Sequence, residues 1–462
     1  MEKNYKKINL SLFFILILII GFLLRYFNNF NQIFWNDENL TLFITEPYIT
    51  FEEFQNRHKI LDESPIIYFY ILRLYNNIFY TSEFLRLNSI IFSTLAIFIS
   101  YNFFKIFFDK KISLLCVSLI SFNIFLIWYA KEARIASSVI FFGLLNIIIF
   151  YKFLKKNNLK NKLILFLINL FTLSYYPFLL MIILSQLLYV IQNNRSKIKS
   201  YLIIFILTIG SYIYLNLDYI LIKTIKPSHH FPLEISFFIN YFFRSFFGSI
   251  IFGGFSLVLF TIGIFYLIRN HRNDFKIFNL YIIIITYTFA IAYSFFKGGG
   301  VIAPRYFIFI IPSIIFVIVN VLSLERFKYV KYSYLILTLI NTFILFDHWK
   351  IKKPKVEFLL NNIDANITKN YFVDEGGFGE YKDVYNSYFL NSSLINKKLN
   401  YVKKSNIYDY DKIYFICLNH AEMHVGLDRT IQDPKKCNIK LNGFNILNEK
   451  EIKDFKLILF AK

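Results

Sequence analysis

The stretch "SPIIYFYILRLYNNIFY", residues Ser64–Tyr80, decides how this chain is threaded through a membrane. Its apolar residues favour a helix, and Pro65 suits the first helical position. Polar side chains spaced i, i+3, i+4 and i+7 form a stripe on one face of that helix, namely Arg73, Asn76, Asn77 and Tyr80. A helix with one polar and one apolar face favours the membrane surface over a transmembrane position. We therefore predict an interfacial helix here.

Basic clusters later in the chain support the same interpretation. If residues 65–80 crossed the membrane, every later loop would change sides and the clusters would lie outside, against the positive-inside rule. With the helix lying flat, the clusters face the cytoplasm. They are "KKNNLKNK" (Lys155–Lys162), "NRSKIK" (Asn194–Lys199), "RNHRNDFK" (Arg269–Lys276) and "ERFKYVK" (Glu325–Lys331).

The composition indicates a polytopic membrane protein. Hydrophobic residues make up 56% of the 462 residues, with 58 Phe and 34 Tyr, which is too much apolar surface for an ordinary soluble domain. The formal net charge of +21 would by itself suggest a nucleic-acid partner. Because the basic residues recur in short clusters between apolar runs, we expect membrane lipids and no nucleic acid as partners.

The apolar runs predict about eleven transmembrane helices. The first run follows a basic start, is too long for a signal peptide and lacks a small-residue cleavage site, so we expect a retained span with a cytoplasmic N-terminus. The odd number of spans places the C-terminus outside, in a multi-pass protein of the plasma (inner) membrane. The predicted spans are 8–27, 84–108, 112–130, 133–154, 162–178, 179–193, 200–222, 242–268, 276–296, 305–324 and 332–348.

The composition changes near Lys350, where the long apolar runs stop. We predict a transmembrane module over residues 1–349 and a small extracytoplasmic α/β domain over residues 350–462. The expected strands are "NYFV", "KIYFICL" and "FKLILF", and "EYKDVYNSYFLNSSLI" is an expected helix. Cys417 and Cys437 both lie in this region, where a disulfide and two unpaired thiols are equally compatible with the spacing.

This topology gathers the chemically interesting charges on the extracytoplasmic side. They are Asp37 and Glu38 in "FWNDENLTLF", Asp62 and Glu63 before Pro65, "YAKEAR" (Tyr129–Arg134), "KPSHHFP" (Lys226–Pro232) and "KGGGVIAPRYF" (Lys297–Phe307).

The order of these motifs resembles a known family. An Asp-Glu pair after the first span, an acid before Pro65 and its aromatic helix, "SEFLRLNS" (Ser82–Ser89), "YAKEAR", and a Pro-Arg-Tyr that opens a late span are similar to GT-C glycosyltransferases of the dolichyl-phosphate-mannose-protein mannosyltransferase-like superfamily. The lipid A aminoarabinose transferase is a relative. The resemblance is strongest over residues 30–155 and weaker to about residue 324. It implies a mainly α, GT-C type polytopic protein.

The resemblance implies a membrane glycosyltransferase. It would move a sugar from a polyprenyl-phosphate donor to a hydroxyl of a lipid, glycan or protein acceptor. Asp37 corresponds to the catalytic base, although a carboxylate here could also simply cap the helix that follows. Glu38 would orient an arginine or contact the acceptor, or only favour the helix N-terminus electrostatically.

Cations are needed to hold the departing phosphate. Arg305 follows a Gly-rich turn and Pro304 at a helix start, where backbone N–H groups also favour an anion. The alternative is an arginine that snorkels at the end of a span. Arg134 and Lys131 are the second choices, and there the alternative is mutual neutralisation with Glu132.

Asp62 and Glu63 are expected in an acceptor or substrate loop. The resemblance also implies a metal-binding role for Glu63, with His229 or His230 as its partner, so a divalent metal is one alternative and a metal-free enzyme the other. A ligase or polymerase of lipid-linked glycans and a lipid or sugar transporter are the competing functions. Transporters place ionisable groups near the membrane midplane, whereas most charges here lie at span ends.

Overall fold

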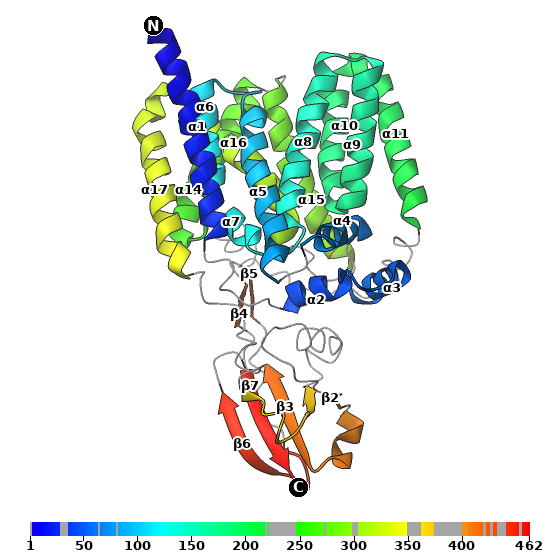
Figure 1. The fold of residues 1–462 in the computed structure, drawn as a ribbon. Coiled ribbons are helices and arrows are strands. Elements are labelled where there is room, and N and C mark those ends of the chain that lie inside the picture. The colour runs from blue at the N-terminus through cyan, green and yellow to red at the C-terminus, as the bar shows by residue number, and fades with distance from the viewer. Residues whose placement is uncertain are drawn as a thin grey trace.

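The protein, seen in a computed structural model, combines a helical bundle with a small sheet (Figure 1). The sheet lies beyond the end of the bundle opposite the N-terminus. The structure describes residues 2–27, 36–62, 65–79, 82–217, 220, 246–271, 274–297, 304–348, 362–373, 400–402, 404–418, 422–425, 428–431, 440–451 and 455–462.

Helices occupy each of the ranges that the apolar runs predicted as spans. The α-helices are α1 (Glu2–Tyr26), α2 (Asn36–Ile44), α3 (Phe51–Leu61), α4 (Ile66–Asn76), α5 (Ser82–Phe104), α6 (Lys110–Ser121), α7 (Ile124–Ala130), α8 (Ala136–Lys155), α9 (Leu159–Tyr175), α10 (Leu180–Asn193), α11 (Ile198–Leu215), α14 (Ile250–Asn270), α15 (Phe278–Lys297), α16 (Ile311–Leu322) and α17 (Lys328–His348). Short 3₁₀ turns are η1 (Pro177–Leu179), η2 (Arg195–Lys197), η3 (Phe275–Ile277), η4 (Pro304–Ile310), η5 (Glu325–Phe327) and η7 (Lys404–Asp409).

The chain is a multi-pass membrane protein. Within the described ranges, 6 helices are long and apolar enough to cross a membrane, or up to 7 if the bent pair α6 and α7 is one span. Helices α1 and α10 contribute shorter apolar stretches, Ser11–Tyr26 and Pro177–Asn193. The expected total of about eleven crossings therefore stays a prediction. Apolar side chains such as Ile206 and Phe265 are exposed on the outside of the bundle, where lipid would cover them.

Helices α2, α3 and α4 lie across the end of the bundle that faces the sheet (Figure 1). As the polar stripe predicted, α4 is not among the candidate spans: it begins directly after Pro65 and has 11 residues, too few to cross the hydrocarbon core. Thr50 caps α3 by accepting a hydrogen bond from the Glu53 N–H at 3.1 Å. These three helices form the surface on which the candidate site is built.

The predicted span 112–130 is not one continuous helix. It breaks after Ser121, and α6 and α7 meet at an angle of 56°. Asn123 begins α7, because its side-chain oxygen accepts the Leu126 N–H at 3.0 Å. The guanidinium of Arg25, which is fully buried, donates to the last carbonyls of α6, at 2.9 Å to Ser121 and 3.4 Å to Ile120. Side chains thus satisfy backbone groups that the break exposes.

The predicted span 242–268 begins later than expected. Its helix, α14, starts at Ile250. Gly248 has a φ of 85°, which a helix cannot accommodate and which glycine adopts without a steric penalty. Ser249 then caps the helix by accepting the Phe252 N–H at 3.2 Å. Residues 242–245 lie outside the described part of the chain.

The strands after the bundle form a small mixed sheet. They are β1 (Asn370–Val373), β2 (Asn400–Tyr401), β3 (Lys412–Leu418), β4 (Glu422–Val425), β5 (Asp428–Ile431), β6 (Asn445–Glu451) and β7 (Phe455–Ala461). The five-stranded sheet has the order β2-β1-β3-β7-β6, and β4 pairs with β5 separately. The pairs β1–β2 and β1–β3 are parallel, whereas β3–β7 and β6–β7 are antiparallel.

The expected strands "NYFV" and "KIYFICL" coincide with β1 and β3, and "FKLILF" forms most of β7. Strand β6 was not predicted, because every residue in it is exposed and its sequence lacks the apolar alternation of a half-buried strand. The expected helix over residues 380–395 and the pairing of Cys417 with Cys437 concern parts that the structure does not describe. The assignment of residues 350–462 as a separate domain stays a prediction.

Helices α14 and α16 approach each other closely at Gly263. A Cβ atom there would lie 2.5 Å from the backbone oxygen of Val317, closer than such atoms can come. We expect Gly263→Ala to separate the two helices and to lower the thermal unfolding temperature of the detergent-purified protein. Gly254→Ala in the same helix is the control, since nothing lies within 4 Å of its added Cβ. Equal unfolding temperatures for the two variants would contradict this packing.

Candidate active site

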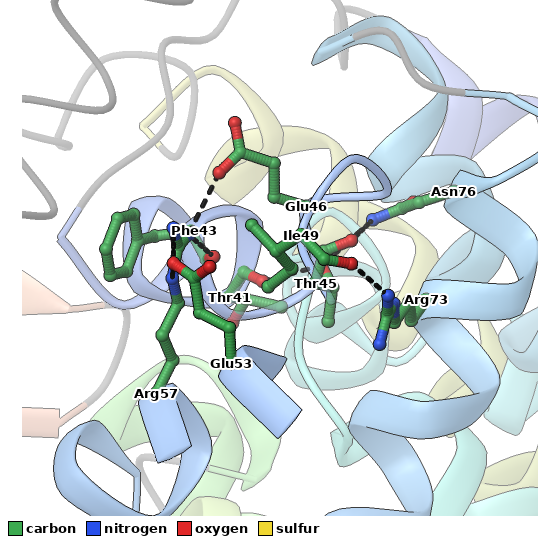
Figure 2. Close-up of polar contacts among 9 residues, drawn as sticks. All are labelled: Thr41, Phe43, Thr45, Glu46, Ile49, Glu53, Arg57, Arg73 and Asn76. Carbon is green, nitrogen blue, oxygen red and sulfur yellow. Dashed lines mark hydrogen bonds and ion pairs between the residues drawn. The ribbon is translucent and has the colours of Figure 1, made fainter. Parts of the chain in front are cut away.

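Side chains of α3 and α4 contact the end of α2 and the segment that follows it (Figure 2). Arg57 donates to the Phe43 carbonyl at 2.8 Å and pairs with Glu46 at 2.9 Å. Arg73 donates to the Ile49 carbonyl at 2.5 Å, and Asn76 to the Thr45 hydroxyl at 2.9 Å. Helix α2 has only 9 residues, too few to be stable alone, and these contacts fix its last turn and the connection that follows it.

Asp37 and Glu38 lie in the first turn of α2, the place where the dipole of a helix favours negative charge. The side chain of Asp37 is outside what the structure describes. The Glu38 side chain is fully buried and forms a two-pronged ion pair with Arg86 of α5, at 2.7 and 2.8 Å. Glu38 also accepts the Ala133 N–H at 2.9 Å. The glutamate therefore connects α2 to α5 and to the turn before α8.

Asp62 and Arg134 form a second ion pair beside the first. Their N–O distance is 3.1 Å, and the side chains are 7% and 25% exposed, respectively. Arg134 also donates to the Thr41 hydroxyl at 3.2 Å, and its carbonyl accepts the Ser89 hydroxyl at 3.3 Å. Asp62 follows α3 as its C-cap, so Arg134 links α3, α2 and α5 at one point.

Lys131 lies at the C-terminal end of α7 and is nearly buried. Its ammonium donates to the carbonyl of Phe27, next to α1, at 3.0 Å. The "YAKEAR" segment is thus tied to α1 through Lys131, to α2 through the Ala133 N–H, and to α3 through Arg134.

Arg305 opens η4 and is half-buried among aromatic side chains. Its guanidinium carbon lies 5.4 Å from the ring centroid of Tyr306. The Tyr306 ring stacks on Phe178 at 5.6 Å, and its carbonyl accepts the Tyr176 hydroxyl at 3.1 Å. Arg305 is therefore connected to the end of α9, whose last residue, Tyr175, packs against Tyr68 of α4.

Several of the predicted residues come together, and others cannot be located. Glu38, Asp62, Arg134 and Lys131 all lie at the junction of α2, α3, α7 and α8. Glu63, His229 and His230 fall outside the described residues, so the predicted metal site stays a prediction. Among the residues that can be located, no group of three or more His, Cys, Asp or Glu side chains could hold a metal ion.

Arg86 and Tyr68 contribute to this junction but were not predicted as site residues. Arg86 is 2% exposed and sits in the first part of α5, within the "SEFLRLNS" segment. A charge inside an apolar helix requires a partner, and that rule could have identified it. Tyr68 is 3% exposed. Burial is the main cause that raises the pKa of its phenol well above the usual value, and the nearby carboxylates of Asp62 and Glu38 contribute.

The sequence is similar to one known family. Residues 63–215, which run from the α3–α4 connection to the end of α11, match the family described as dolichyl-phosphate-mannose-protein mannosyltransferase. The match includes Arg86 and Arg134 but ends before Arg305, and it begins after Asp37 and Glu38. No curated protein matches the sequence significantly. The closer relation to the lipid A aminoarabinose transferase stays a prediction.

The fold is similar to that of a solved structure, the oligosaccharyltransferase of Archaeoglobus fulgidus. Its apo form matches with a TM-score of 0.52 and 12% identity, over 82% of this chain and 64% of that chain. The same enzyme tethered to an acceptor peptide containing the NVT sequon matches with a TM-score of 0.47 and 12% identity, over 82% and 63%. This chain thus spans less than two thirds of that enzyme's length, and the similarity concerns the fold alone.

Removing one partner of the buried Glu38–Arg86 pair should destabilise the protein. Glu38→Gln keeps the size of the side chain but removes the negative charge that faces the buried Arg86 guanidinium, which should cost about 3–5 kcal/mol of unfolding free energy. The control is Glu53→Gln, because Glu53 pairs with Arg57 at 2.5 Å but is 49% exposed. That change should cost less than about 1 kcal/mol. Unfolding of both variants in detergent measures the difference, and similar losses would contradict a structural role for the buried pair.

Proposed function

We propose that this chain is a membrane glycosyltransferase that uses a polyprenyl-phosphate-linked sugar and an acceptor hydroxyl on the extracytoplasmic face. The observation that carries the proposal is the junction of α2, α3, α7 and α8, where paired carboxylates and guanidiniums surround the first turn of α2 at one end of a membrane bundle. The family match over residues 63–215 supports the same activity.

The proposed reaction needs a base, and Asp37 is our candidate. Its carboxylate takes the proton of the acceptor hydroxyl, whose oxygen forms a bond to the anomeric carbon of the sugar. The bond between that carbon and the phosphate oxygen breaks, and the polyprenyl phosphate leaves with the electron pair. Glu38, next to Asp37, would orient the site by holding Arg86 and the Ala133 N–H.

The leaving phosphate needs cations, and Arg305 remains the first candidate. Its guanidinium is half-buried at the start of η4, so it is accessible to a ligand, and guanidinium binds phosphate with two hydrogen bonds. Arg134, which is 25% exposed, is the second candidate, and Lys131 the third because it is nearly buried. Asp62 and Glu63 are assigned to the acceptor side, and Glu63 with His229 and His230 to a divalent metal if one is used.

The direction of the helices supports an extracytoplasmic site. Successive helices of the bundle run in alternating directions, so the basic loops between α8 and α9 and between α10 and α11 lie at the same end as the N-terminus (Figure 1). The α2–α4 surface and the C-terminal sheet lie at the other end. By the positive-inside rule, the N-terminal end is cytoplasmic and the site faces the outside of the plasma (inner) membrane.

A transporter is a less suitable interpretation of these charges. Glu38, Asp62 and Arg134 lie at helix ends and in connections, not along a central pathway. The buried polar residues inside the bundle, such as Asn146, Asn169 and Gln186, bond to one another and are amides without charge. A ligase or polymerase of lipid-linked glycans is closer in chemistry, but such an enzyme would not need the Asp-Glu pair in the first turn of α2.

Asp37→Asn tests the base directly. The amide keeps the size and polarity of the side chain but cannot take a proton, so we expect transfer to fall at least about 100-fold while membrane insertion is normal. Release of polyprenyl phosphate from a panel of polyprenyl-phosphate-linked sugars measures the reaction in purified protein. The control is Asp109→Asn, since Asp109 caps α6 at the opposite end of the bundle by accepting the Ile112 N–H at 2.9 Å, and asparagine also caps helices. Turnover at the wild-type rate in Asp37→Asn would exclude Asp37 as the base.

Cysteine labelling tests the orientation. In a variant without the native cysteines, Asn158→Cys at the start of α9 should be protected from a membrane-impermeant thiol reagent in intact cells. Ser405→Cys, next to the C-terminal sheet, should react. Both native side chains are exposed, so burial does not explain a difference. Labelling of the first position and protection of the second would reverse the proposed orientation.

A further inference from the structure

Tyr68 occupies a central place among the residues of the proposed site. It lies in the first turn of α4, just after Pro65 and six positions from Asp62 in the chain. Its ring packs edge-on against Tyr175 at the end of α9, with the centroids 6.3 Å apart and the planes at 88°. Only 3% of the residue is exposed.

The contacts of Tyr175 place Tyr68 beside the second ion pair. The Tyr175 hydroxyl donates to Ser138 at 2.6 Å, and Ser138 lies in the first turn of α8, one helical turn beyond Arg134. Arg134 in turn pairs with Asp62. Tyr68 therefore packs on Tyr175, which bonds to the helix that follows Arg134 and directly precedes Tyr176, the residue that bonds to Tyr306.

The hydroxyl of Tyr68 has no hydrogen-bond partner among the residues that the structure describes. By contrast, the hydroxyls of the buried Tyr175 and Tyr201 both bond to neighbouring groups. Leaving a buried hydroxyl without a partner costs free energy, whereas a phenylalanine would fill the same space without that cost. Such a hydroxyl lowers the stability of the free protein. It is expected at a position where a bound ligand supplies the missing hydrogen-bond partner.

The charges around Tyr68 keep its phenol neutral. The nearby carboxylates of Glu38 and Asp62 are each paired with a guanidinium, so these two described pairs add no excess positive charge. Both carboxylates raise the pKa of the phenol in addition to burial and Tyr175, against the effect of Arg134. The phenol therefore stays protonated, so its O–H can donate to a sugar oxygen and its oxygen can accept from a sugar hydroxyl.

We propose that the Tyr68 hydroxyl hydrogen-bonds a sugar hydroxyl of the bound substrate and thereby contributes to sugar selection. This inference rests on the proposed glycosyltransferase function, because it supplies the sugar. The sugar hydroxyl belongs either to the donor or to a glycan acceptor. Arg305 and the other cations hold the phosphate, and Tyr68 contacts the uncharged part of the substrate.

The test is Tyr68→Phe, which removes the hydroxyl and keeps the ring against Tyr175. With the polyprenyl-phosphate-linked sugar that supports wild-type turnover, we expect kcat/KM to fall roughly 5- to 50-fold. Inhibition by sugar-free polyprenyl phosphate should be unchanged. The thermal unfolding temperature should be unchanged or higher, because an unsatisfied buried group has been removed. A loss in the donor kinetics assigns the hydroxyl to the donor sugar, and a loss confined to the acceptor KM assigns it to the acceptor.

The control is Tyr201→Phe, a fully buried tyrosine whose hydroxyl donates to Gln186 at 2.9 Å in the other half of the bundle. It should lower the unfolding temperature and leave the kinetics within about 2-fold. The inference is overturned if Tyr68→Phe lowers stability with unchanged kinetics, or if it weakens inhibition by polyprenyl phosphate as much as use of the donor. If the wild-type protein uses no lipid-linked sugar and its unfolding temperature responds to none, both the inference and the proposed function fail. Wild-type turnover with an unaffected Tyr68→Phe variant rejects the inference alone.

Discussion

The buried ion pair between Glu38 and Arg86 holds the candidate site together. Two charges removed from water are stable only if their geometry is good and their remaining hydrogen-bonding capacity is used. Here the guanidinium faces both carboxylate oxygens at 2.7 and 2.8 Å, and the Ala133 N–H supplies a further donor at 2.9 Å. The pair thereby fixes α2, α5 and the turn before α8 relative to one another. The position of Asp37, one residue before Glu38, follows from it.

Other polar side chains inside the bundle also form hydrogen bonds within the protein. Arg25 donates to Ser93 at 2.7 Å and to backbone carbonyls where α6 ends. Asn146, Asn169 and Gln186 bond to one another across α8, α9 and α10. In lipid a polar group without a partner is costly, so interhelical hydrogen bonds of this kind connect helices that apolar packing alone would leave free to slide. The Tyr68 hydroxyl lacks such a partner, as do the side chains of Thr208 and Asn320 among the described residues.

Local patterns in the sequence predicted much of the fold. The polar stripe identified α4 as a surface helix, and the apolar runs located the bundle helices and the strands β1, β3 and β7. The failures depend on long-range contacts or on single residues. The break at Asn123 is stabilised by Arg25, about a hundred positions away, which no local window includes. Strand β6 is specified by its pairing with β7, not by its own exposed side chains.

In the candidate site, too, local motifs were predictable from the sequence and long-range contacts were not. The motifs predicted that Glu38, Asp62, Lys131 and Arg134 lie near one another, because the expected topology puts them all on one side of the membrane. Their partners could not be predicted, because the pairing of Glu38 with Arg86 joins residues 48 positions apart and depends on how α2 folds back onto α5. Tyr68 could not be identified from the sequence, because what distinguishes it is a buried hydroxyl without a hydrogen bond, and only the structure shows this.

The short helix α2 has a consequence for how the protein is made. Synthesis in the membrane proceeds from the N-terminus, so α2 emerges before Arg86 and well before Ala133, the groups that hold Glu38. Nine residues do not form a stable helix in isolation. A growing chain that ends before α8 therefore carries the proposed base in a segment without a fixed shape. On the proposed mechanism, the site forms late in biogenesis, once the helices that bind Glu38 have been inserted, and a chain stalled midway through insertion has no activity.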